Sequence, residues 1–150
     1  MCFDSNFKKQ LPNHVAFIMD GNRRWAKKKK LKIIDGHKKG SEIVKKIVKK
    51  SLEFNIKYLT FFSFSTENWS RSKAEILNLQ TLLSFYLDSE EENFIKKKIK
   101  FSFIGEIDKF DYKIKSKLKN LQVRTKSFKK LHFTLALSYG SRSEIVNSIK

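Results

Sequence analysis

The fold of this chain is indicated first by residues 14–25, which read HVAFIMDGNRRW. Five consecutive apolar residues, Val15–Met19, run directly into a carboxylate, a glycine, an amide and two guanidinium groups. This order predicts a buried strand that delivers a charged loop to the edge of a sheet. Ligands of open parallel sheets bind at the carboxyl ends of strands, so we expect binding chemistry in this loop.

The polar residues of the loop have chemical uses at such an edge. Asp20 can hold a cation, and Gly21 lets the backbone approach a ligand. Arg23 and Arg24 carry planar donor forks suited to phosphate. The alternative interpretation is a solvated turn that only ends the strand, and the spacing by itself leaves both interpretations open.

The length of 150 residues predicts one domain with a modest core. We expect an N-terminal tail over residues 1–13 and the domain over residues 14–150. The sequence shows neither an apolar stretch long enough to cross a bilayer nor the apolar run of a signal peptide. Cys2 is the single cysteine, so we expect no internal disulfide, no cysteine-rich zinc site and a cytoplasmic location.

The formal net charge is +18, from 33 lysines and arginines against 15 acidic residues. So basic a domain can bind nucleic acid, an anionic membrane or phosphorylated small molecules. Only five of the basic residues are arginines, and four of these lie in or beside polar motifs that follow predicted strands. Because a guanidinium binds phosphate in a bidentate manner, this placement favours phosphate binding over chance.

Segments typical of strands alternate with segments typical of helices, which predicts an α/β fold with a parallel β-sheet flanked by helices. Apolar residues recur at helical spacing over residues 43–52, and the lysines among them predict a solvated helix face. The predicted strands are Val15–Met19, Tyr58–Phe64, Ile99–Ile104 and His132–Ser138.

The helix predicted over residues 76–87 is apolar around nearly its whole circumference. Such a helix is buried in the core, pressed against another subunit, or lines an apolar cavity. A small domain has limited interior, so the excess points to an oligomer interface or a long apolar ligand. The helix predicted over residues 113–125 has an ordinary surface pattern.

A second polar motif, Ser65–Arg71, follows the second predicted strand and reads STENWSR. Its serines can be explained as helix caps, with Ser70 or Ser72 acting together with Glu75. Capping leaves the amide, the indole and the guanidinium of the motif without a role.

A third motif, Ser138–Arg142, places a glycine and an arginine after the fourth predicted strand. Three polar loops at one sheet edge, each with an arginine, predict an electropositive pocket for a polyphosphate. His37 opens the first long helix, where it could donate to a phosphate, although a lone histidine is more often a structural donor.

Together these motifs resemble those of the cis-prenyltransferases of the undecaprenyl diphosphate synthase type. The resemblance covers nearly the whole chain from His14 onward, with several long motifs in the same order. The matching motifs are His14–Asn22, Arg24–Lys27, Gly36–Lys38 with Gly40, Phe64–Trp69 with Arg71, and Tyr139–Gly140 with Arg142.

The resemblance implies condensation of isopentenyl diphosphate onto an allylic, farnesyl-type diphosphate, with a cis double bond at each addition. It implies that Asp20 and Asn68 are catalytic and that Asp20 carries Mg²⁺. The substrate-binding residues that it implies are Gly21, Asn22, Arg23, Arg24, Trp25, His37, Ser65, Thr66, Glu67, Trp69 and Arg71.

The physical logic of this reaction agrees with the residues. Breaking an allylic C–O bond leaves diphosphate, whose developing charge is stabilised by a cation and by fixed donors. The amide of Asn68 is a poor base, so we expect it to orient a substrate or a water while the departing diphosphate takes the proton. The apolar helix over residues 76–87 is the candidate wall of a dry tunnel for the isoprenoid.

Four features depart from the family pattern. Arg23 stands in place of a glycine and would crowd the phosphate loop if its φ were positive. Ile33 replaces a phosphate-binding arginine, and Ser138 and Ser141 replace an asparagine and a glycine. The sequence ends at Lys150, so we expect the fold to lack the usual C-terminal strands and helices, as in a truncated product.

These observations leave three functional classes. The first is a Mg²⁺-dependent cis-prenyltransferase that forms a homodimer and makes peripheral contact with the membrane surface. The second is a non-catalytic remnant that at most binds prenyl diphosphate. The third, a nucleic-acid-binding domain, ranks last because the aromatic residues lie mostly in apolar strands and not on a basic stacking surface, so no nucleic-acid partner is expected.

Overall fold

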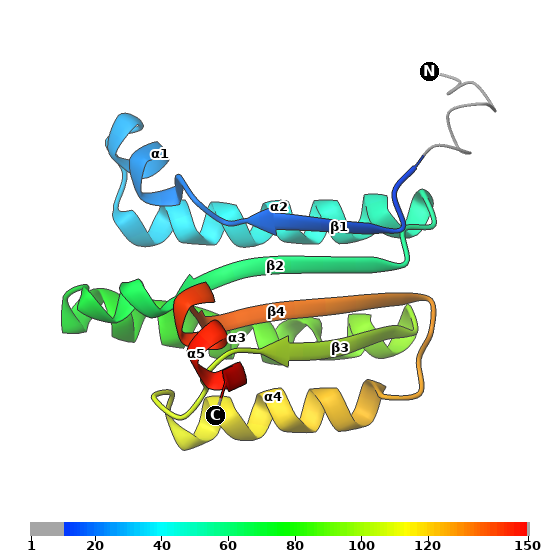
Figure 1. Cartoon of the computed structure of the whole chain (residues 1–150). Coiled ribbons are helices and arrows are strands. Elements are labelled where there is room, and N and C mark those ends of the chain that lie inside the picture. The colour runs from blue at the N-terminus through cyan, green and yellow to red at the C-terminus, as the bar shows by residue number, and fades with distance from the viewer. Residues whose placement is uncertain (1–10, 150) are drawn as a thin grey trace.

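The structure is a computed structural model that describes residues 11–149. Strands and helices alternate along the chain (Figure 1). The predicted tail is described only from residue 11, so Cys2 lies outside the described residues. The elements are β1 (His14–Ile18), α1 (Asn22–Lys28), α2 (Ile33–Glu53), β2 (Tyr58–Ser65), the 3₁₀ helix η2 (Thr66–Ser70), α3 (Lys73–Lys96), β3 (Ile99–Ile104), α4 (Tyr112–Thr125), β4 (Leu131–Tyr139) and α5 (Ser141–Ile149).

The four strands form one parallel sheet in the order β1-β2-β4-β3. This confirms the predicted α/β fold with its parallel sheet and flanking helices. The predicted strand bounds differ from the observed ones by one residue at most. Met19 lies just beyond β1, but its N–H still donates to the Phe62 carbonyl at 3.0 Å, so the polar loop begins directly at the sheet edge.

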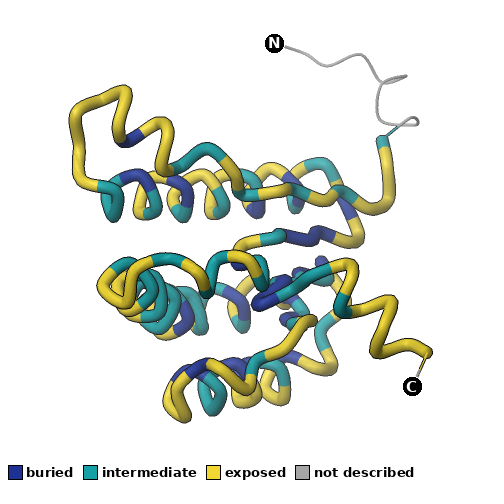
Figure 2. Tube along the Cα trace, turned by 60° about the vertical axis from the view of Figure 1, so that its left-hand side comes forward, coloured by how far each residue is buried: buried dark blue, intermediate teal, exposed yellow. Residues whose placement is uncertain are grey.

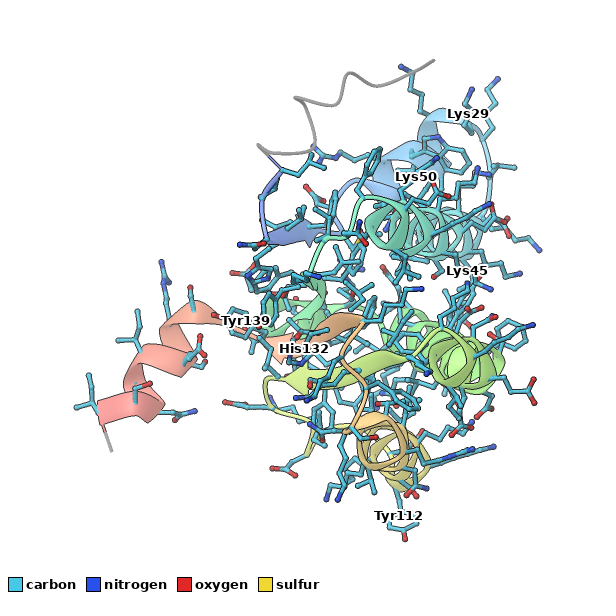
Figure 3. All side chains as sticks on the ribbon, turned by 90° about the vertical axis from the view of Figure 1, so that its right-hand side faces the viewer. Lys29, Lys45, Lys50, Tyr112, His132 and Tyr139 are labelled. Atoms are coloured by element: carbon cyan, nitrogen blue, oxygen red, sulfur yellow. The ribbon has the colours of Figure 1, made fainter. Side chains whose placement is uncertain are left out.

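The main core lies between one face of the sheet and the helices α2, α3 and α4 (Figure 3). The register places Leu59 beside Phe133 and Phe133 beside Phe101, which forms one apolar row across three strands. Leu59 has no accessible surface, and Phe101 and Phe133 are 1% and 5% exposed. Full burial of each such side chain contributes roughly 1.5–3 kcal/mol, so this row contributes strongly to holding the strands in register.

The other face of the sheet is only partly covered, and α5 lies on that side (Figure 3). Four residues in register, His14, Tyr58, His132 and Lys100, form a row across this face. The Tyr58 ring lies 5.9 Å from the His14 ring and 5.8 Å from the His132 ring, and Tyr58 is 50% exposed. This row therefore carries polar or ionisable groups, whereas the corresponding row on the covered face is entirely apolar.

The helices follow the predicted patterns with one informative difference (Figure 2). The lysines of α2 are exposed, as its amphipathic pattern predicts. The helix α3 starts at a cap in which Ser72 Oγ accepts from the Glu75 N–H. Although α3 is apolar all round, Leu77 and Phe85 are 66% and 61% exposed. No helix within residues 11–149 is long and apolar enough to span a membrane.

Candidate active site

The loops after β1, β2 and β4 meet at the carboxyl edge of the sheet, as the parallel topology predicts. Trp69 Nε1, from the second loop, donates to Ser138 Oγ at 2.9 Å. A Cβ built on Gly140 would lie 2.6 Å from Thr66 Oγ1, so the third loop packs directly on the second. Arg23, from the first loop, reaches Glu75 in the first turn of α3.

The first loop turns sharply at Gly21, whose φ is 91°. This left-handed conformation favours glycine because any side chain would be strained there. The Gly21 N–H donates to Asp20 Oδ1 at 2.6 Å, and Arg24 Nη2 donates to Asp20 Oδ2 at 2.8 Å. The side chains of Asp20 and Arg24 are 74% and 79% exposed, so both remain accessible to a ligand from solvent.

Two glycines of α2 seat the first turn of α1. A Cβ on Gly36 would lie 2.2 Å from the Asn22 carbonyl oxygen, and one on Gly40 would lie 2.7 Å from Asn22 Oδ1. The spacing of four residues places both glycines on the same face of α2. The two helices can therefore approach closely only because these positions lack side chains, and this contact holds Asn22 at the site.

A carboxylate joins the first and second loops. Arg71 Nη1 lies 3.0 Å from Glu75 Oε1, and Arg23 Nη1 lies 3.7 Å from Glu75 Oε2. The Glu75 side chain is only 13% exposed. The sequence indicated Glu75 only as part of a helix cap, and its i,i+4 spacing from Arg71 was the available signal for this second role.

Arg23 does not crowd the phosphate loop. Arg23 lies inside α1 and its φ is not positive. Within the first loop, only Gly21 has a positive φ. The helical backbone lets the Arg23 guanidinium point toward α3. The substitution of glycine by arginine therefore adds a cation beside the site without straining the turn.

His37 lies next to this charged cluster. Its Nε2 is buried and has no hydrogen-bond partner within the described part of the chain. Burial lowers the pKa of His37 below its usual value of about 6.5, and the positive charges of Arg71 and Arg23 lower it further, while Glu75 opposes this. The neutral imidazole has a buried nitrogen open to a ligand, which fits the predicted binding role.

The second loop uses most of its polar groups to build its own structure. Ser65 Oγ accepts from the Glu67 N–H at 3.1 Å, and Asn68 Oδ1 accepts from the Ser65 N–H at 2.9 Å. These bonds form a capping box around η2. Capping therefore explains Asn68 as well as the serines. The sequence alone indicated a capping role only for the serines.

The two tryptophans have different surroundings. The Trp69 ring packs 4.8 Å from the Phe64 ring and 5.1 Å from the Phe110 ring, and it contacts the main core. Trp25, on α1, is 37% exposed. Trp69 thus packs between the second loop and the core, while Trp25 remains accessible near the first loop.

The third loop contributes few groups to the site. Ser138 adopts a φ of 50°, a conformation that asparagine tolerates better than serine. Arg142 lies exposed on α5, and the Tyr139 hydroxyl donates to Glu144 of the same helix. Ile33 is the first residue of α2 and carries no charged group, and the loss of a phosphate ligand at this position stays a prediction.

An apolar cavity of about 220 Å³ starts at the polar loops and runs between α2, α3 and the sheet. Asn22 and His37 line one end of it. Leu79, Leu83 and Leu87 of α3 line its length. This confirms that α3, apolar all round, forms the wall of a cavity, as one of the predicted alternatives requires.

Asp20 is the candidate Mg²⁺ ligand. Within residues 11–149 no group of three or more His, Cys, Asp or Glu side chains could hold a metal ion. Mg²⁺ is commonly held by one or two carboxylates together with substrate phosphates and waters. One exposed aspartate in a loop with two neighbouring arginines fits that donor set.

Residues 18–150 match the family model of undecaprenyl diphosphate synthase, a prenyltransferase family. The match spans most of the sequence and includes all three polar loops. The chain therefore belongs to the undecaprenyl diphosphate synthase family of prenyltransferases.

Similar proteins agree with this family. An isoprenyl transferase of Aquifex pyrophilus is 42% identical over 94% of this chain and 61% of its own length. A ditrans,polycis-undecaprenyl-diphosphate synthase of Micrococcus luteus, described as (2E,6E)-farnesyl-diphosphate specific, is 41% identical over 94% of this chain and 57% of its own length.

The fold agrees as well. Lavandulyl diphosphate synthase from Lavandula x intermedia, solved in complex with dimethylallyl diphosphate, superposes with a TM-score of 0.88 at 32% identity. The superposition covers 92% of this chain and 59% of that structure. The chain therefore spans about three fifths of the length of these relatives.

Proposed function

We propose that this chain binds an allylic diphosphate at the carboxyl edge of the sheet and receives its prenyl group in the cavity. The observation that carries the proposal is the continuity of the two regions. Asn22 and His37 belong to the polar edge and also line the apolar cavity. An amphiphile with an anionic head and a linear apolar tail matches both ends of this site.

The head group would meet donors from the first loop and from helix α2. The backbone at Gly21 and the guanidinium groups of Arg23 and Arg24 provide the first set, and the neutral His37 imidazole provides a buried donor in the tautomer that carries its proton on Nε2. Because a guanidinium binds phosphate as a fork, the arginines would hold the diphosphate in a defined orientation. Arg24 would exchange Asp20 for the diphosphate, which frees the carboxylate.

Asp20 would then hold Mg²⁺, which neutralises the negative charge that develops on the departing diphosphate. The reaction we propose is a condensation of isopentenyl diphosphate onto the allylic carbon with cis stereochemistry. The fixed donors of the first loop stabilise the leaving group without reorganising, because the turn at Gly21 and the packing of α1 on α2 already position them.

The second substrate would bind near Ser65, Asn68 and Arg71. The Asn68 amide oxygen is used by the Ser65 N–H, which leaves the amide nitrogen to orient a substrate. Thr66, Glu67 and Trp69 would complete this side of the site. The proton released in each addition goes to the departing diphosphate, since a neutral amide is a poor base.

The proposal extends to the surroundings of the enzyme. A homodimer is expected from the family resemblance, and the exposed apolar residues of α3 favour a contact of this kind. The lysine cluster Lys27–Lys30 is exposed and would be drawn to anionic lipid at the cytoplasmic membrane surface.

A second candidate function is binding without turnover. It is favoured by one observation, that Asn68, which the resemblance implies to be catalytic, is engaged in the capping box of η2. In that case the chain would hold prenyl diphosphate at the first loop, and incorporation of isopentenyl diphosphate would be absent.

Isothermal titration with farnesyl diphosphate tests the binding step. We expect micromolar binding that requires Mg²⁺ and is lost in Asp20→Ala. The exposed Asp108 lies in the loop after β3, at the opposite end of the strand order from β1, so Asp108→Ala is the matched control and should bind as the unaltered chain does. Absence of binding by the folded, unaltered chain would refute the proposal.

Incorporation of labelled isopentenyl diphosphate then separates the two candidate functions. Product from the purified chain, abolished by Asp20→Ala, would establish the transferase. Binding of farnesyl diphosphate without product would establish the binding-only alternative.

A further inference from the structure

The cavity has a solvent-facing side where α2 and α3 approach each other. Lys45, on α2, bridges this gap in the view along the strands (Figure 3). Its Nζ lies 2.5 Å from Glu90 Oε1 and 4.9 Å from the centre of the Tyr86 ring, both on α3. All three residues line the cavity.

This contact differs from the other charged contacts of α2. Lys39 and Lys50 pair with glutamates of their own helix. Within residues 11–149, Lys45–Glu90 is the only ion pair that joins α2 to α3. Asn93 Nδ2 also donates to Glu90 Oε2, at 3.0 Å, so the carboxylate is held in place from its own helix.

The position along the cavity is also informative. Lys45 follows His37 by eight residues of the same helix, which corresponds to a rise of about 12 Å. The contact therefore lies well away from the proposed head-group site, beside the part of the cavity that would hold an apolar tail. The aliphatic stem of Lys45 can line the cavity while its ammonium group stays partly in solvent, since the Lys45 side chain is 43% exposed.

We infer that Lys45, Glu90 and Tyr86 form a clasp that closes the solvent-facing side of the cavity and retains the apolar tail of a bound ligand. The inference rests on the proposed function in taking that ligand to be a linear apolar chain with a phosphate or diphosphate head. With the clasp closed, the tail leaves only along the cavity toward the polar loops. With the clasp open, α2 and α3 separate and the tail can leave sideways.

The expected effect is modest because the ion pair is partly exposed. Such pairs contribute little, and a cation–π contact adds a comparable amount, so loss of the clasp should raise the dissociation rate of a long-tailed ligand about two- to fivefold. A ligand without a tail does not reach the clasp, and its affinity should not change.

The experiment compares Lys45→Met and Glu90→Gln with the matched control Lys46→Met. Lys45→Met keeps most of the aliphatic stem and removes the charge. Lys46 is an exposed lysine of the same helix and forms no ion pair within the described residues. Dissociation rates are measured by displacement for dodecyl phosphate and for farnesyl diphosphate, and affinity is measured for inorganic pyrophosphate.

We expect both clasp variants to release dodecyl phosphate faster, while Lys46→Met behaves as the unaltered chain and pyrophosphate affinity is unchanged. The double exchange Lys45→Glu with Glu90→Lys should restore slow release. Raising KCl from about 0.1 M to about 1 M should narrow the difference, because the Debye length shortens from roughly 10 Å to roughly 3 Å.

Equal rates of dodecyl phosphate release from Lys45→Met and Lys46→Met would overturn the clasp. A change in the pyrophosphate affinity of Lys45→Met as large as its change in dodecyl phosphate release would overturn it as well. The two probes keep the proposals separate. If dodecyl phosphate shows the effect and farnesyl diphosphate does not bind, the clasp stands and the proposed function fails. If neither probe binds the folded chain, both fail.

Discussion

The loops after β1 and β2 lie at the same edge of the sheet but use their polar side chains differently. In the first loop, Asp20 and Arg24 are bound mainly to each other and are largely exposed. In the second loop, Asn68 caps η2 and Trp69 packs against the core. The first loop thus keeps its charged groups available for a ligand, whereas the second uses its groups for structure.

The comparison shows that two polar motifs at the same edge of a sheet can be stabilised in different ways. The first loop is held in place by the close contact of α1 with Gly36 and Gly40 of α2, so the Asp20 and Arg24 side chains are not needed to fix the backbone of the loop. The second loop is stabilised by hydrogen bonds between its own residues. Substitutions in the first loop should therefore affect binding, and those in the second should affect stability.

The largest expected effect is on Trp69. Trp69→Ala removes a large, partly buried ring that packs against the core, so we expect the free energy of unfolding to fall by about 3 kcal/mol, the lower end of the range for a buried aromatic residue. Trp69→Phe keeps an aromatic ring but loses the hydrogen bond to Ser138, and it should cost less. Chemical denaturation measures the unfolding free energy of both variants. A loss below about 1 kcal/mol in Trp69→Ala, which is no more than one exposed ion pair contributes, would contradict the structural role of Trp69.

The contact between α1 and α2 comes next. In Gly36→Ala the new Cβ would meet the backbone oxygen of Asn22, so the first turn of α1 must shift, and we expect a loss of about 1–3 kcal/mol. In Gly40→Ala the Cβ meets the Asn22 side chain, which can move, so the loss should be smaller. Thermal unfolding of both variants checks this order, and equal losses would show that α1 moves as easily as the side chain.

Asn68 tests the second loop directly. Asn68→Ala breaks the capping box, so we expect a loss of about 0.5–2 kcal/mol in unfolding free energy. Asn68→Asp keeps the acceptor oxygen and should recover most of this stability. If Asn68→Ala unfolds as the unaltered chain does, the residue is available for substrate alone and the contrast between the two loops is weakened.

The first loop should show the opposite behaviour. Arg24→Ala removes an exposed ion pair, so its unfolding free energy should change by less than about 1 kcal/mol. Its affinity for farnesyl diphosphate should fall about tenfold or more, because a charged hydrogen bond to phosphate is lost. Titration and denaturation of the same preparation separate the two effects.

The smallest expected effect is the pH dependence of stability. Burial lowers the pKa of both His37 and His132 in the folded chain, helped by Arg71 for the first and by Lys100 for the second. The unfolded chain therefore binds more protons near pH 6, and stability should be complete above about pH 6.5 and fall as the pH drops below it.

Melting curves between about pH 5 and about pH 7.5 measure this dependence. His37→Gln cannot titrate, so its melting temperature should fall less steeply in acid than that of the unaltered chain. An unchanged slope in His37→Gln would mean that His37 is already solvated in the folded state.

Much of the fold could be predicted because the spacing of apolar residues and the local composition determine which segments form strands and helices. The apolar run before Asp20 and the nearly apolar run of β2 indicated parallel strands, and the recurring apolar residues of α2 indicated its buried side. The strand order could not be predicted in this way, since the placement of β4 between β2 and β3 depends on which faces the helices cover.

Less of the site could be predicted. The spacing around Gly21 indicated a turn with polar groups, and the structure has that turn. The sequence did not show that Glu75 joins Arg23 to Arg71, or that Asn68 caps its own loop, because these contacts depend on where α1 and η2 lie relative to α3.

The sequence by itself determined the parallel α/β class, the polar strand ends and the apolar character of α3, because each depends on residue types at fixed local spacing. Only the tertiary structure decided which polar groups face a ligand, how the cavity joins the edge at His37, and that Lys45 meets Glu90 across two helices. These contacts join residues far apart in the chain, and their distances follow from how the helices pack on the sheet, which local periodicity does not specify.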